Sequence, residues 1–261
     1  HTPPPPPPPT PHVCRRQRQM CIRDRPRSSP RVRAATSSLS LSARVGLFLA
    51  TVLAIIALAV LPLLTPWFIH RALDAAGSAE LLGLTETQTH KMSDRSVEQL
   101  VLGGDFDFAG PDGEPFYDPD ERGHLGDARL LLGVFLVAGG IGIIAIGAAL
   151  GAWRDRRAAI WTVVRRAGLT ASLVVVVLGF VSLVAFDSLF TLFHQVFFPG
   201  GNWSFDPSTQ RLVQLYPFRF WQIASAALGT LIFLIGLATW LVGRWASGRA
   251  AADSTPGAPA S

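Results

Sequence analysis

Two histidines, His124 and His194, carry the side chains best suited to proton transfer in this sequence. Imidazole gains and loses a proton near neutral pH, so it can serve as a general acid or base. Between the two histidines lie an apolar run, LLLGVFLVAGGIGIIAIGAAL, an arginine-rich turn, and a second apolar run, ASLVVVVLGFVSLVAF. Such runs match the ~30 Å hydrocarbon core of a bilayer. The pattern predicts a membrane hairpin that brings both imidazoles to one membrane surface.

The composition supports a membrane protein. Hydrophobic residues make up 49% of the chain and charged residues only 16%. Residues 71–127 hold 13 of the 18 acidic residues but only four of the 23 basic ones, which predicts an extracytoplasmic segment. The net charge of +5 arises from arginines that flank apolar runs, so it favours anionic lipid headgroups over nucleic acid.

The fold class predicted from these runs is an all-α membrane protein with four transmembrane helices. Basic residues before the first span, in the middle turn and after the last span place both termini in the cytoplasm. The two outer segments are an insertion, which forms a small cap of helices and loops, and an aromatic loop. The expected location is a membrane with a site at its outer face, and the family resemblance given below implies that this is a bacterial cytoplasmic membrane. The membrane domain is expected over 45–245. Its four spans are expected at about 45–69, 130–151, 167–186 and 221–242. The insertion is expected over 71–128 and the aromatic loop over 190–220.

Both ends of the chain are expected to be disordered, over 1–44 and 246–261. The first begins with a polyproline tract, and its string VCRRQRQMCIRDR resembles translated sequencing-adapter read-through, so this segment is interpreted as partly artefactual. It also contains both cysteines, Cys14 and Cys21. From residue 42 onward the sequence therefore excludes a thioester intermediate and a cysteine-ligated zinc site.

The outer insertion offers little recognisable chemistry. Ser93 is expected to cap a short amphipathic helix. The acidic residues that follow lack the ligand spacing of an EF-hand, so they are interpreted as a solvated loop, with no metal and no cofactor. His70 and His90 are expected to be a span-end and a loop residue. In the second span, Gly147 and Gly151 are expected to pack helices together.

Several strings resemble the integral membrane family that includes the bacterial lipoprotein intramolecular transacylases. They are KMSDRSVEQLV, HLGDARLL, FHQVFF and WSFDP, and the resemblance extends over roughly residues 43–244. Two positions depart from it. Phe218 follows a proline where an acid is expected, and Gln210 stands where an aspartate is common. These two departures leave the exact substrate undetermined, whereas the predicted fold still matches that of the family.

The resemblance implies an acyltransferase that moves the sn-2 acyl chain of an S-diacylglyceryl cysteine to its own α-amino group and gives a lyso-form lipoprotein. It implies diacylglyceryl-modified lipoproteins and membrane lipid as partners, and His124 and His194 as the catalytic pair. Five residues are candidates for support. Arg129, Asn202 and Trp203 are possible oxyanion donors, and Asp127 and Asp206 are possible partners that orient an imidazole.

The chemistry suits these residue types. The amine attacks the ester directly, so the enzyme needs only a base for the amine proton and an acid for the departing alkoxide. Two other functions remain open from the residues alone. One is a membrane lipid or ester hydrolase, in which water replaces the amine. The other is a non-enzymatic membrane protein that binds a partner or senses lipid.

Overall fold

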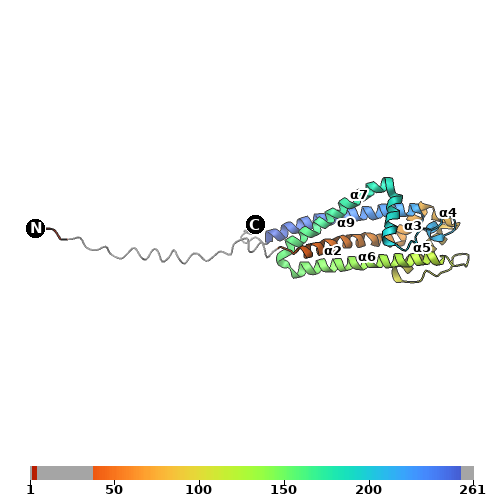
Figure 1. Ribbon diagram of the computed structural model, residues 1–261, viewed down its shortest axis with the longest axis horizontal. Helices are drawn as coiled ribbons and strands as arrows, with labels where there is room; N and C mark the ends of the chain where they lie inside the picture. Colours follow the sequence, from red (N-terminus) through yellow and green to blue (C-terminus); the bar gives the residue numbers. More distant parts are fainter. Residues whose placement is uncertain (1, 5–37, 254–261) are drawn as a thin grey trace. The chain divides into compact units, whose positions relative to one another are not determined.

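The computed structural model describes residues 2–4 and 38–253 (Figure 1). The chain divides into two units, His1–Ser38 and Leu39–Ser261, and every helix named below lies in the second. Most of the predicted N-terminal disordered segment lies outside the described residues. Helix α2 begins at Leu41 and α9 continues to Asp253, so helix replaces the disorder expected at 41–44 and 246–253.

Within residues 38–253, four helices are long and apolar enough to cross a membrane, which confirms the predicted all-α fold with four spans. They are α2 (Leu41–Val60), extended by the 3₁₀ helix η1 (Leu61–Leu64), α6 (Pro119–Ala152), α7 (Arg157–Phe197) and α9 (Phe218–Asp253). A short 3₁₀ helix, η2 (Arg154–Arg156), joins α6 to α7. Helices α6 and α7 are much longer than the spans expected from hydropathy, because polar residues continue both helices beyond the apolar runs.

Helix α2 is the centre of the bundle and packs against α6, α7 and α9, while α7 also packs along α9. Glycines allow the close approach. A Cβ at Gly142 would lie 2.5 Å from the carbonyl oxygen of Ala50 on α2, and one at Gly168 would lie 2.6 Å from that of Gly236 on α9. Gly147 and Gly151 have nothing within 4 Å of such a Cβ, so the expectation that they pack helices was wrong.

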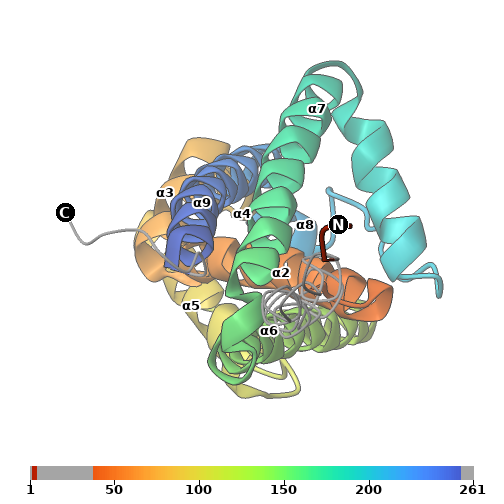
Figure 2. The same cartoon turned by 90° about the vertical axis from the view of Figure 1, so that its left-hand side faces the viewer.

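Helix α7 is broken at Ala185, where φ is −141° and ψ is 36°. The helix tilts away from α6 before the break, and the following segment returns toward the bundle as a separate arm (Figure 2). We call residues 186–197 the α7 arm. The predicted hairpin is therefore splayed, and α7 packs against α9 and α2 rather than along α6. The α7 arm, not a loop, carries His194.

The outer segments form a second core of short helices. They are α3 (Pro66–Ala76), α4 (Ser78–Leu82), α5 (Glu86–Leu102) and α8 (Arg211–Leu215). Helix α5 begins at a capping box between Thr85 and Gln88, so the expected cap at Ser93 was wrong. Ser93 is buried in mid-helix and its hydroxyl lies 2.9 Å from that of Tyr216, whose pKa burial raises to about 12. This pair joins the two outer segments.

Candidate active site

The two predicted catalytic histidines lie side by side. The ring centroids of His124 on α6 and His194 on the α7 arm are 5.9 Å apart, with an angle of 24° between the ring planes. His194 is buried and His124 is partly buried. His124 precedes the apolar run at Leu130 by about 9 Å of helix, which is headgroup depth in a bilayer. With the apolar run that starts at Leu130 in the hydrocarbon core, the histidine pair would be level with the ester bonds of a membrane lipid.

An aromatic enclosure surrounds the pair. His124 contacts two of its rings at centroid distances of 4.6 and 5.5 Å, and His194 contacts four at 4.2 to 5.5 Å. The members are Phe190, Phe193, Phe198, Trp203 and Phe205. Phe218, which departs from the family pattern, extends the enclosure through contacts with Phe186 and Phe190. These rings cover most of the His194 imidazole and part of that of His124, and such partial removal from water strengthens electrostatic interactions.

The hydrogen bonds of the two imidazoles differ. The Nδ1 of His194 lies 2.7 Å from the carbonyl oxygen of Phe190. A carbonyl only accepts, so Nδ1 carries the proton and Nε2 of a neutral ring is left with a free lone pair. In the described part of the chain, the buried Nδ1 of His124 has no hydrogen-bond partner. The Nε2 lone pair of a neutral His194 is thus left to accept a proton, while the buried Nδ1 of His124 stays unpaired among the described residues.

The structure brings only some of the five candidate supporting residues close to the histidine pair. The ring centroid of Trp203 lies 5.1 Å from that of His194, with the ring planes tilted by 36°. Asn202 donates to the Asp127 carboxylate at 2.9 Å and ties the aromatic loop to α6, one turn from His124. Arg129 donates to the Gly104 carbonyl oxygen and lies over the ring of Phe106.

Asp206 does not orient either imidazole. Its Oδ1 accepts from the backbone N–H and the hydroxyl of Ser208, at 2.9 and 2.7 Å. The Ser208 hydroxyl lowers the pKa of this exposed carboxyl group. Asp206 stabilises the loop turn instead.

A buried carboxylate missed from the sequence holds the two outer segments together at the site. Glu121, which is 1% exposed, accepts from the backbone N–H of Asp118 at 2.7 Å and from that of Leu212 at 2.6 Å. Gln210, the other departure from the family pattern, donates to Asp118 at 2.8 Å. The signal in the sequence was the Asp-Pro-x-Glu string that forms a capping box. Glu121 thereby fixes α8 against the start of α6, which carries His124.

A sequence profile of the lipoprotein intramolecular transacylase Lit matches residues 45–221, which is more than half of the chain. The chain belongs to the lipoprotein intramolecular transacylase family. The resemblance seen in the sequence is thus confirmed, and the protein is an integral, multi-pass membrane protein of a transacylase family. The family name implies lipoprotein substrates.

Solved structures of the family share the fold. A structure of the transacylase Lit from Bacillus cereus gives a TM-score of 0.68 at 17% identity, covering 79% of this chain and 94% of that one. A variant of that protein in which one histidine is replaced by arginine gives 0.64 at 16%, covering 81% and 93%. An uncharacterized Aquifex aeolicus protein is 32% identical over 76 residues, or 29% of this chain and about a third (35%) of its own length.

A second histidine pair lies in the outer segment and was not expected. His70 and His90 stack with centroids 4.0 Å apart, and each binds a carboxylate on the other helix. The Nε2 of His70 lies 2.8 Å from Asp94, and that of His90 lies 2.6 Å from Asp74. The repeated His-x-x-x-Asp spacing, in HRALD and HKMSD, was the available signal. The four side chains cross-link α3 and α5.

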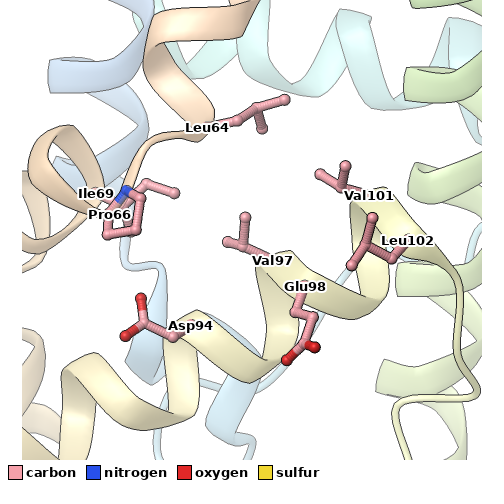
Figure 3. A pocket seen from close by; sticks show the side chains of 8 residues that line it. All are labelled: Leu64, Pro66, Ile69, Asp94, Val97, Glu98, Val101 and Leu102. Atoms are coloured by element: carbon pink, nitrogen blue, oxygen red, sulfur yellow. The ribbon is translucent and has the colours of Figure 1, made fainter.

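An apolar pocket of about 330 Å³ lies beside this cross-link, between η1, α3 and α5 (Figure 3). Its walls are mostly aliphatic, and the carboxylates of Asp94 and Glu98 lie at its lower side in the figure. The other lining residues are Leu64, Pro66, Ile69, Val97, Val101 and Leu102. The pocket contains neither His124 nor His194, so it is separate from the candidate reaction site.

The acidic loop is tied down by arginines. Asp112 forms an ion pair with Arg211 on α8 at 2.5 Å, and the Arg211 hydrogen bond lowers the pKa of Asp112. Asp107 pairs with Arg122 on α6 at 3.1 Å. The expected solvated loop is thus exposed but structured, and it docks on both outer segments.

Proposed function

We propose that this protein moves the sn-2 acyl chain of an S-diacylglyceryl cysteine to the α-amino group of the same cysteine, giving a lyso-form lipoprotein. The observation that carries the proposal is the contact between His124 and His194 inside an aromatic enclosure at headgroup depth. Membership of the transacylase family supports the reaction class. The residues from α6 and the α7 arm then form one acid–base pair.

In this reaction the cysteine nitrogen attacks the sn-2 ester carbonyl, a C–N bond forms, and the C–O bond to glycerol breaks. The nitrogen loses a proton and the glycerol oxygen gains one. Nε2 of His194 is the base, because its Nδ1–H is held by Phe190. His124 gives the proton to the oxygen. Transfer of a proton from His194 back to His124 then restores the starting protonation states. Because the two rings exchange a proton, they titrate as a coupled pair.

The tetrahedral intermediate needs a donor for its oxyanion. We assign this role to Trp203. It contacts His194, whereas Arg129 is engaged by a backbone carbonyl and Asn202 by Asp127. The Asn202–Asp127 bond instead keeps the loop that carries Trp203 against α6.

The test of this function is mass spectrometry of lipoprotein N-terminal peptides from cells that express the protein and from cells that lack it. We expect N-acyl, lyso-form peptides only in the first. Release of free fatty acid without N-acylated peptide would show a hydrolase. The same peptides in both cells would reject the proposal.

The proposed site faces outward, with both termini and the arginine-rich turn near Arg156 in the cytoplasm, because the short basic loops set the orientation. The test starts from the protein with Cys14 and Cys21 replaced by serine. A cysteine at Asp112 is expected to react with an impermeant maleimide in intact cells, and a cysteine at Ala158 only after permeabilisation. The reverse labelling pattern would show that the topology is the opposite of the one proposed.

A further inference from the structure

A second cavity, a groove of about 450 Å³, lies between α2 and α7 at the end of the bundle near the arginine-rich turn. It opens to the outside of the helix bundle. Its lining residues are Arg44, Val45, Phe48, Leu49, Val163, Arg166, Leu169 and Thr170. We call it the α2–α7 groove.

The α2–α7 groove combines an apolar wall with two positive charges. Phe48, Leu49 and Leu169 offer hydrocarbon surface. In the described part of the chain, neither Arg44 nor Arg166 forms an ion pair with a carboxylate. Two guanidinium groups without a counter-ion, set in the wall of a membrane-spanning helix pair, favour an anion at this place.

Both walls belong to candidate membrane spans, so the surrounding solvent is lipid. Basic pockets between membrane helices bind anionic headgroups, because the guanidiniums interact with the phosphate while the chains stay in the hydrocarbon. We propose that the α2–α7 groove binds one anionic phospholipid from the leaflet at the arginine-rich end of the bundle. Arg44 and Arg166 hold its phosphate, and an acyl chain lies along Phe48 and Leu169.

This site is independent of acyl transfer. About 28 Å of helix separates Arg166 from the break at Ala185, and His194, with His124 of α6 beside it, lies beyond that break. The lipid would hold α7 against α2 at one end of the bundle. It is neither substrate nor product of the proposed reaction.

The experiment measures retention of dioleoyl phosphatidylglycerol and dioleoyl phosphatidylcholine by the full chain in detergent, using native mass spectrometry. We expect the wild-type protein to retain phosphatidylglycerol about tenfold better or more, as two arginines at an anionic headgroup imply. The double variant Arg44→Gln/Arg166→Gln should lose this preference. The control variant Arg154→Gln/Arg249→Gln removes two positive charges from the same end of the bundle but outside the groove. It should keep the preference for phosphatidylglycerol.

Equal retention of both lipids by the wild type, or equal loss in both double variants, would overturn the site. A second variant, Val163→Trp, fills the groove without a change of charge and should also lose phosphatidylglycerol. Glycerophosphoglycerol, the headgroup without chains, should not displace the lipid. Full displacement by it would reject a lipid in favour of a phosphate site. Melting temperatures in detergent confirm that each variant is folded.

Discussion

Replacing His194 by asparagine is expected to lower N-acyl lipoprotein formation by at least about 100-fold, because general acid–base catalysis contributes about 10²–10⁴-fold. Asparagine can still donate to the Phe190 carbonyl oxygen, so the α7 arm should keep its place while the base is lost. His124→Ala should show a similar loss. The double variant should be scarcely worse than either single one, since groups that act as a unit give non-additive losses.

The matched control is His90→Gln, which alters a histidine of the same protein outside the candidate site. It should retain activity within about tenfold, because an exposed ion pair contributes little. The measurement is the ratio of lyso-form to diacylglyceryl peptide, normalised to the amount of each variant in the membrane. Wild-type product from the double histidine variant, at wild-type protein levels, would leave the pair without a catalytic role.

The sequence predicted the four spans and the meeting of His124 with His194, because apolar runs of membrane length are a strong local signal. The route by which they meet was not predictable in the same way. A straight hairpin was expected, but α7 breaks at Ala185, in an apolar run that has no proline and whose glycine, Gly179, lies six residues before the break. The weak signal was Asp187, whose charge suits the first turn of a new helix. Helix breaks of this kind depend on tertiary packing that one sequence does not display.

The contacts between the two outer segments were also hidden in the sequence. Glu121 looked like one of many acids in a loop, yet it is buried between residues far apart in the chain. Ser93 resembled a cap and is a buried partner of Tyr216 instead. Hydropathy predicts the depth of a residue in a bilayer. The partners of these buried polar residues depend instead on which loop packs against which helix. The family resemblance named the histidines but carried no information on the groups that hold them.

Replacing Glu121 by alanine is expected to loosen the outer half of the molecule and to lower activity without any direct part in proton transfer. The change leaves the backbone N–H groups of Asp118 and Leu212 without their acceptor. Each buried unsatisfied donor costs about 1–3 kcal/mol, so the unfolding free energy should fall by about 2–5 kcal/mol. The measurement is the melting temperature of the purified protein in detergent, together with lyso-form product in cells.

Asp120→Ala is the matched control, since Asp120 is an exposed acid of the same helical turn. It should melt like the wild type. Glu121→Gln should be intermediate, because an amide oxygen can accept from one of the two N–H groups while the amide nitrogen opposes the other. If Glu121→Ala melts like Asp120→Ala, the start of α6 does not depend on α8. The enclosure around His124 would then be held by the aromatic contacts together with the Asn202–Asp127 and Gln210–Asp118 hydrogen bonds, which join the same loop to α6.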